Sequence, residues 1–395
     1  MTPKGAGLVA LSGFYFLYFG ALGVTLPFFP AYLKSLSLSV SEIGVLLALP
    51  TLLSLFAPPF WGQLADWTGR SDRVLNVVSL GAGVCFALLL FAHRFGPLLL
   101  VVGAYALFNS SITPLIDSLT LQRIALSGGS FARVRLFGSI GFVLSSSLFG
   151  ISVASIGRAT VIAPLCLMAG YFAWSLGIRA RSASLSSPGP LSGLRLLADR
   201  DLAIFLPAAA LHWIACAPFH GTFSIHVQAL RLPPAVIGLA AGLGVLAETA
   251  FMYFYPRFAQ RITARHLLFL AFFGSSLRWI GMALVSRSAL IILLSLLHAL
   301  TFGAFYVASV AFVSSRAPEQ LRASGQALFA SATFGVGGLI GYVSSGLGYD
   351  LLGGHRLFAA AGIVDLLAAA IILGLKRIQP QAESTSAVAE PGEAL

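Results

Sequence analysis

The sequence predicts an all-α membrane protein, and three observations support this fold class. Of its 395 residues, 58% are hydrophobic and only 9% are charged, which is more apolar surface than a water-soluble domain can bury. The apolar residues form long unbroken runs instead of the alternating segments of about 10 residues that are typical of membrane barrels. Each run also supplies the roughly 20 residues that a helix needs to cross a bilayer core, where only helices and closed barrels satisfy the backbone.

Twelve such runs divide the chain into two halves of six. We expect membrane-spanning helices at residues 8–33, 41–61, 73–93, 97–120, 132–153, 158–178, 201–226, 234–256, 265–286, 289–313, 322–347 and 355–375. The halves flank the one long polar segment, which begins as a Ser/Pro/Gly linker and could end in a short interfacial helix. The predicted domains are therefore an N-terminal six-helix bundle (1–180), a cytoplasmic linker (181–200), a C-terminal six-helix bundle (201–378) and a disordered tail (379–395).

Membrane orientation explains the formal net charge of +11. With both termini in the cytoplasm, seventeen of the 24 Lys and Arg residues fall on the cytoplasmic side and six fall outside. This bias follows the positive-inside rule and predicts a multi-pass protein of the bacterial inner (cytoplasmic) membrane. It argues against nucleic acid as a partner. All three cysteines fall within predicted spans and show neither a disulfide framework nor metal-site spacing, so we expect no metal and no cofactor.

Three ionisable residues, Glu248, Arg278 and His298, stand near the middle of separate apolar runs. A charge at mid-membrane costs roughly 2.5–3.5 kcal/mol and commonly marks a functional site. We expect the three to share one cavity, with Glu248 as the first candidate proton carrier and His298 titrating near physiological pH. Arg278 would modulate Glu248 or bind a substrate carboxylate in a bidentate manner. The structural alternative is a permanent Glu248–Arg278 ion pair.

Further polar and aromatic side chains extend the candidate site. Asp117 and Arg135 lie at matching depth and could contact substrate, form an inner gate or simply lock two helices together by a salt bridge. Asp365 is a further candidate acid for proton coupling, beside Glu248, His298 and Asp117, or else part of a local structural network. Aromatic residues favour an aromatic carboxylate as substrate. The remaining candidates for substrate binding are His212, His220, Tyr15, Tyr18 and Tyr306.

The segment GQLADWTGR resembles the loop 2–3 signature of the major facilitator superfamily. Gly62, Asp66, Gly69 and Arg70 match that signature, whereas Trp67 replaces its usual basic residue. The two glycines permit a close approach and a tight turn, and Asp66 can accept hydrogen bonds from helix N-terminal amides or from an arginine. The resemblance implies a conformational latch, and the alternative is an ordinary polar loop.

Longer stretches resemble the phenylpropionate-permease branch of that superfamily, which is related to the lactose permeases and the nucleoside proton symporters. They are YFLYFGALGVTLPFFPAYL, RVRLFGSIGF, GVLAE, LRW, LHALTFGAFY and GQALFASATFGVGGLIG. Tyr306 stands where this branch often has histidine. The resemblance to the lactose permeases is more distant and implies a sugar-binding role for residues like Asp117 and Arg135. The lactose permeases have a glutamate one turn after the histidine of their tenth helix. In this sequence Thr301 stands at that position, so proton coupling cannot be identical.

These features predict a secondary active transporter that works by alternating access between two six-helix bundles of the major facilitator fold. The leading hypothesis is proton-coupled symport of a small organic solute, driven by a proton gradient, with an aromatic carboxylate such as 3-phenylpropionate implied by the resemblance. The alternatives are a nucleoside or sugar proton symporter, a proton-driven exporter of sugars or drugs, and a non-transporting receptor or lipid-moving protein. An enzyme is not expected, since no nucleophile with a nearby base and no phosphate-binding glycine loop is found. The expected partners are the solute, protons and the lipid bilayer, with the protein as a monomer.

Overall fold

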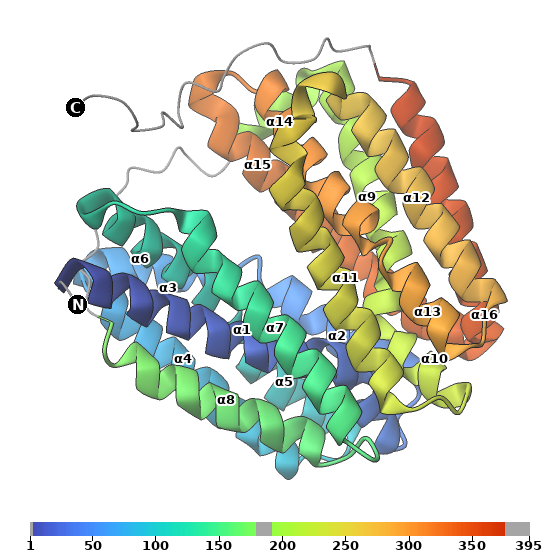
Figure 1. The fold of residues 1–395 in the computed structure, drawn as a ribbon, viewed down its shortest axis with the longest axis horizontal. Coiled ribbons are helices and arrows are strands. Elements are labelled where there is room, and N and C mark those ends of the chain that lie inside the picture. Colours follow the sequence, from blue (N-terminus) through green and yellow to red (C-terminus); the bar gives the residue numbers. More distant parts are fainter. Residues whose placement is uncertain (1–2, 179–191, 376–395) are drawn as a thin grey trace.

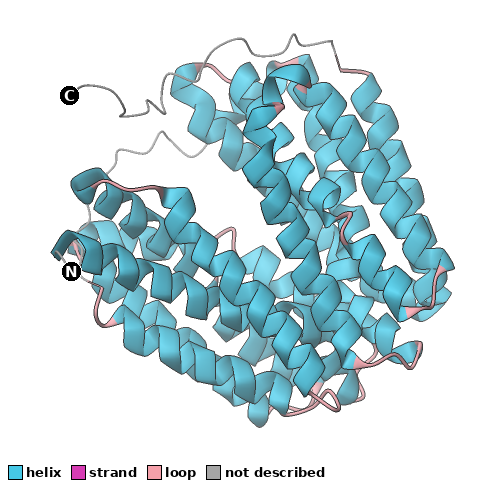
Figure 2. Ribbon diagram, in the orientation of Figure 1, coloured by secondary structure: helices cyan, strands magenta, loops and turns pink. Residues whose placement is uncertain are grey.

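The computed structural model describes residues 3–178 and 192–375, which form two helical bundles (Figure 1). Every regular element in these residues is a helix (Figure 2). Most of the predicted linker and the whole predicted tail at 379–395 lie outside the described residues. Within the linker, Ser192–Ala198 forms a 3-10 helix where a short interfacial helix was expected.

The N-terminal bundle makes six membrane passages from eight α-helices. They are α1 (Pro3–Ser35), α2 (Val40–Leu53), α3 (Ala57–Thr68), α4 (Ser71–Ala87), α5 (Phe95–Asn109), α6 (Ile112–Ser127), α7 (Phe131–Ser152) and α8 (Ala159–Ser175). The predicted passage at 41–61 is divided between α2 and α3, and the passage at 97–120 is divided between α5 and α6. A proline in the first turn of α3 explains the first break, because proline has no N–H to continue the preceding helix.

The C-terminal bundle contains two π-helical segments among its helices. Its elements are α9 (Arg200–Gly221), α10 (Phe223–Ala229), α11 (Pro234–Phe254), α12 (Ala264–Leu284), α13 (Ser288–Ser295), η5 (Ala299–Ala304, π), α14 (Phe305–Arg316), α15 (Arg322–Ala330), η7 (Ser331–Gly337, π) and α16 (Gly338–Leu373), with short 3-10 turns η3 (Tyr255–Arg257), η4 (Ala259–Arg261) and η6 (Glu319–Leu321). Helix α16 covers parts of the last two predicted passages. Gly353 interrupts it with a φ of 74°, a backbone conformation that favours glycine.

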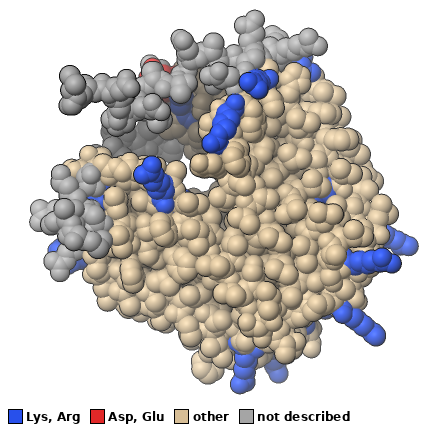
Figure 3. Space-filling view, viewed as in Figure 1, with Lys and Arg blue, Asp and Glu red and all other residues tan. Residues whose placement is uncertain are grey.

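All twelve predicted passages are present. Ten helical stretches are long and apolar enough to cross a membrane, one of which, Arg322–Leu373, contains two passages, and the shorter apolar helix Ala159–Ser175 supplies another. Large apolar side chains such as Leu284, Leu351 and Phe91 are each at least 78% exposed, as a lipid-facing surface requires. Figure 3 shows Lys and Arg gathered toward two ends of the molecule, with a broad uncharged band between them.

The two bundles diverge toward the side where α6 and α15 lie and touch at the opposite side (Figure 1). At this closed side α7 packs against α11, and α2 packs against α16. Glycines permit the contact: a Cβ on Gly238 would lie 2.1 Å from the carbonyl oxygen of Ser146, and one on Gly346 would lie 2.6 Å from that of Val40. Only a residue without a Cβ fits at such distances.

A hydrogen-bond cluster joins the bundles at the same side. The carboxylate of Asp350 on α16 accepts from the backbone N–H groups of Val40 and Ser41, at 3.2 and 2.7 Å. These groups begin α2, where backbone N–H groups have no partner within the helix. Ser39 and Glu42 cap the same helix end from its own bundle, so α2 is anchored from both halves.

The predicted latch adopts only part of the expected geometry. Gly69 ends α3 with a φ of 62°, and its N–H bonds to the carbonyl oxygen of Asp66 at 3.3 Å, which confirms the tight turn. Arg70 follows as the N-cap of α4. The close approach expected at Gly62 is wrong in this conformation, because a Cβ there would meet nothing within 4 Å.

The glycine contacts predict that Gly238→Leu weakens the closed side, since the new side chain cannot fit against Ser146. Arg158 and Gln228 are exposed, one in each bundle, and can carry spin labels as Arg158→Cys and Gln228→Cys in a cysteine-free background. In the Gly238→Leu variant, electron–electron double resonance should show a population with a longer distance between the two labels. Gly96→Leu is the matched control, because nothing lies within 4 Å of a Cβ at that position. An unchanged distance distribution in the Gly238 variant would contradict the packing argument.

Candidate functional site

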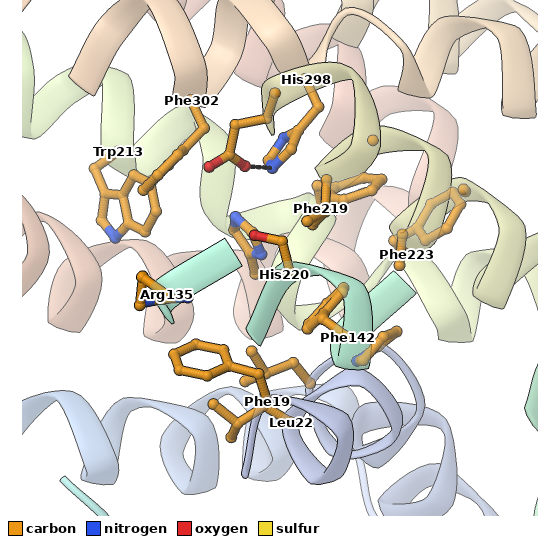
Figure 4. A pocket seen from close by; sticks show the side chains of 18 residues that line it. Phe19, Leu22, Arg135, Phe142, Trp213, Phe219, His220, Phe223, His298 and Phe302 are labelled. Carbon is orange, nitrogen blue, oxygen red and sulfur yellow. Dashed lines mark ion pairs between the residues drawn. The ribbon is translucent and has the colours of Figure 1, made fainter. Parts of the chain in front are cut away.

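A cavity of about 270 Å³ lies between the two bundles. In Figure 4, Phe19, Leu22 and Arg135 lie on one wall, and Trp213, His298 and Phe302 lie on the facing wall. Most of the lining is aromatic or aliphatic, and four side chains in it are ionisable. These four are Arg135, His220, Glu248 and His298.

Three side chains, on α11, on α12 and at the residue directly before η5, form a hydrogen-bonded row in the C-terminal wall. Oε2 of Glu248 lies 3.3 Å from Nε2 of His298, the contact marked by the dashed line in Figure 4. On the other side of the ring, Nδ1 of His298 lies 3.1 Å from Nη1 of Arg278. Gly244 on α11 permits this arrangement, because a Cβ there would lie 3.3 Å from Cβ of His298.

The chemistry of the guanidinium group assigns the protons in this row. Arginine only donates hydrogen bonds, so Nδ1 of His298 accepts one from Arg278. His298 is therefore neutral here and directs its Nε2–H toward the Glu248 carboxylate. The row can thus be written as a cation, a neutral ring and a carboxylate, with Glu248 at the cavity and 17% of its side chain exposed.

Arg278 is not where the sequence prediction placed it. The expectation that Arg278 shares the cavity is wrong, because it is not among the lining residues. The structural alternative, a direct Glu248–Arg278 ion pair, is wrong too, because His298 stands between the two side chains. Arg278 is 0% exposed, with its guanidinium carbon 4.1 Å from the centre of the Phe219 ring, which separates it from the cavity. The Nε and Nη2 atoms of Arg278 have no hydrogen-bond partner among the described residues.

The N-terminal wall presents Arg135 to the cavity. Its guanidinium carbon lies 3.8 Å from the centre of the Phe19 ring, a cation–π geometry. The salt bridge that was one alternative for Asp117 and Arg135 is absent from the ion pairs of the described residues. Asp117 instead accepts a hydrogen bond from the hydroxyl of Tyr15. Arg135 therefore faces the cavity without an ion-pair partner in the described part of the chain.

Several expected site residues lie outside the cavity lining. Tyr15 and Tyr18 are buried in the N-terminal bundle, and Tyr306 is 39% exposed and stacks on Phe302. The expectation that His212 lines the cavity is wrong: it is fully buried and contacts Asp365. Asp365, for which no partner could be foreseen, accepts hydrogen bonds from His212 and Trp279.

Sequence reasoning missed much of the aromatic lining. Phe142, Trp213 and Phe219 line the cavity, but nothing distinguished them from the many other aromatic residues in apolar runs. A usable signal lay at the junction of α9 and α10, where Phe219 and Phe223 are four residues apart and their rings pack at a centroid distance of 4.7 Å, with His220 beside Phe219 at 5.7 Å. The π-helical segment η5 beside His298 was also missed, because helix-period extrapolation assumes 3.6 residues per turn.

The comparisons with known proteins agree with this architecture. The model of the MFS_1 like family matches residues 8–360. The chain belongs to this family of major facilitators. This facilitator is 28% identical over 367 residues to the probable 3-phenylpropionic acid transporter of Escherichia coli (strain K12), covering 89% of the chain and 93% of the relative. It is also 28% identical over 338 residues to the maltose permease of Geobacillus stearothermophilus, covering 82% and 83%.

Other matches extend over nearly the whole facilitator. An uncharacterized transporter, YwbF, of Bacillus subtilis (strain 168) is 25% identical over 384 residues, or 94% of each chain. The crystal structure of the nucleoside transporter NupG superposes with a TM-score of 0.85 at 17% identity, covering 95% of this chain and 99% of that one. The relatives support a transport role for the facilitator, and NupG shows that the fold is shared.

The Tyr15–Asp117 contact predicts a stability difference between two tyrosine variants of this facilitator. Tyr15→Phe leaves the part-buried Asp117 without its donor, at a cost of about 1–3 kcal/mol, so the apparent melting temperature in a fixed detergent should fall. Tyr105→Phe is the control, because its buried hydroxyl has no partner among the described residues and should be dispensable. Equal melting temperatures for the two variants would show that the Asp117 contact contributes nothing.

Proposed function

We propose that this facilitator couples the entry of one proton to the entry of an aromatic monocarboxylate such as 3-phenylpropionate. It would act by alternating access in the bacterial inner membrane, as a monomer with cytoplasmic termini. The observation that carries the proposal is the cavity itself. It places an arginine without an ion-pair partner opposite a Glu248–His298 pair, with aromatic rings between them.

The lining suits a small aromatic acid. A guanidinium group binds a carboxylate in a planar, two-pronged geometry, and Arg135 is the cation available at the cavity. Phe19, Phe219 and Phe302 offer ring faces and edges for the apolar end. The volume of about 270 Å³ lies just below the range of about 300–1,000 Å³ typical of ligand pockets. This favours a single-ring solute over a disaccharide.

Charge balance supplies the coupling. In the empty site the positive charges of Arg135 and Arg278 are matched by the carboxylates of Asp117 and Glu248. An anionic substrate alone would add a negative charge in a region of low dielectric, where an unbalanced charge is costly. A proton on Glu248 removes one negative charge, so proton and anion each favour the binding of the other, and such coupling is reciprocal.

The conformation suits release toward the cytoplasm. Under the positive-inside orientation, the side where α6 and α15 diverge is cytoplasmic, and the glycine contacts close the outer side. Glu248 then lies in a cavity between bundles that open inward, where a proton can leave. The probable 3-phenylpropionic acid transporter among the relatives supports the substrate class, and a maltose permease among them keeps a sugar as the second candidate.

The role of Arg135 predicts a selective loss of affinity. Arg135→Gln should weaken 3-phenylpropionate binding at least about tenfold, since a hydrogen bond to a charged group contributes about 1.5–3 kcal/mol. The neutral amide 3-phenylpropionamide should lose much less. Titration calorimetry on purified protein measures both, with Arg133→Gln as control because Arg133 is exposed on another face of α7. Equal loss for the acid and the amide would rule out carboxylate recognition by Arg135.

Glu248→Gln should separate exchange from accumulation. The amide keeps the shape of the protonated acid but cannot release a proton, so proteoliposomes should exchange labelled 3-phenylpropionate yet fail to concentrate it under an inward proton gradient. Glu42→Gln, which changes an exposed helix-capping carboxylate, is the control. If the Glu248 variant still concentrates substrate, another group carries the proton.

A further inference from the structure

A second charged network lies inside the C-terminal bundle, away from the cavity. His212 on α9 and Asp365 on α16 are both 0% exposed, and neither lines the cavity. Nδ1 of His212 lies 2.7 Å from Oδ1 of Asp365, and its Nε2 lies 2.9 Å from the carbonyl oxygen of Thr301. The indole N–H of Trp279 on α12 donates to Oδ2 of Asp365 at 2.7 Å.

These contacts fix the number of protons in the pair. A carbonyl oxygen only accepts, so Nε2 of His212 must carry a proton. A second proton must then lie between Nδ1 and Oδ1 to make the 2.7 Å contact a hydrogen bond. Because the carboxylate also accepts from Trp279, the ionised form of Asp365 is favoured, and the second proton belongs on Nδ1 of His212. The pair is an imidazolium and a carboxylate with no net charge.

The surroundings hold this proton in place. Sγ of Cys216 on α9 lies 3.6 Å from Nε2 of His212. The rings of Phe272 on α12 and Phe305 on α14 pack on the imidazole at centroid distances of 4.6 and 4.5 Å. The nearest other charged group along α12 is Arg278, the neighbour of Trp279 in the sequence. Arg278 already donates a hydrogen bond to His298. Losing the proton would break one of two hydrogen bonds and leave Asp365 uncompensated in the bundle interior.

The acceptor of His212 belongs to the segment that forms the cavity wall. Thr301 lies in the π-helical segment η5, which begins directly after His298 and also contains Phe302. In η5 the N–H of Phe305 bonds back to the carbonyl oxygen of Leu300, five residues earlier. Short π-helical segments of this kind are frequent at functional sites. His212 therefore holds, from behind, the backbone that presents His298 and Phe302 to the cavity.

We propose that His212 and Asp365 form a proton-retaining pair that positions η5, and that its proton stays with the protein instead of being transported. Both residues then act through His298 as positioning residues. This inference rests on the proposed symport function for its transport test, but the protonation state of His212 can be measured without any substrate.

The pair of variants Asp365→Asn and Asp365→Ala tests the role. Asparagine can donate to Nδ1 of a neutral His212 and still accept from Trp279, so every hydrogen bond survives without the extra proton. Asp365→Asn should therefore concentrate 3-phenylpropionate with the wild-type pH profile, whereas Asp365→Ala should lose most accumulation and shift that profile. Glu248→Gln in the same series reports on the proposed function. If the wild-type protein does not transport 3-phenylpropionate, the proposed function is wrong. The spectroscopic measurement described next still tests the protonation of His212.

Solid-state ¹⁵N spectroscopy of the histidine rings in bilayers is the substrate-independent measurement, with the His212 signal assigned by its loss in His212→Asn. Both ring nitrogens should be protonated from about pH 5 to pH 9. A neutral His212 anywhere in that range would overturn the proposal. So would an Asp365→Asn variant that exchanges substrate without concentrating it, because the pair would then be a coupling site. Wild-type behaviour of Asp365→Ala would remove the positioning role.

Discussion

The hydrogen bond from Arg278 to His298 is the constraint on which the candidate site depends. A guanidinium group cannot accept a hydrogen bond, so it forces His298 to be neutral and to point its one N–H at Glu248. The carboxylate is thereby held at the cavity surface and linked to a buried cation that cannot itself reach the solute. In the proposed mechanism this arrangement lets Glu248 exchange a proton while the rest of the row stays in place.

The two bundles are in close backbone contact on one side of the molecule and are separated by the cavity toward the other side. At the closed side, glycines such as Gly238 and Gly346 bring the backbones of the two bundles together. Toward the open side the bundles diverge, and the cavity with Arg135 and Glu248 on facing walls lies between them. A substrate that bridges both walls would contact both bundles at once, which is how binding energy can favour a change in their relative orientation.

The sequence was sufficient for the architecture because bilayer thickness sets the length of each apolar run. It also identified residues that do line the cavity, Arg135, His220, Glu248 and His298, since polar groups in apolar runs seldom face lipid. The sequence did not predict side-chain partners that depend on how a helix is rotated about its axis. Asp117 and Arg135 share a depth, yet Asp117 meets Tyr15 instead. The π-helical segment after His298 changes the direction in which the following residues of that helix point. The contact of His212 with the carbonyl oxygen of Thr301 therefore could not be inferred from regular helical spacing.

If one proton and one monovalent anion enter together, transport is electroneutral, so a pH gradient drives it and a membrane potential does not. Proteoliposomes containing the wild-type protein can be given an inside-alkaline pH gradient at zero membrane potential, or an inside-negative potential at zero pH gradient. The charge balance of Arg135, Arg278, Asp117 and Glu248 predicts accumulation of labelled 3-phenylpropionate under the first condition and none under the second. Accumulation driven by the potential alone would show that entry of the anion is not electroneutral and would rule out symport of one proton with one anion.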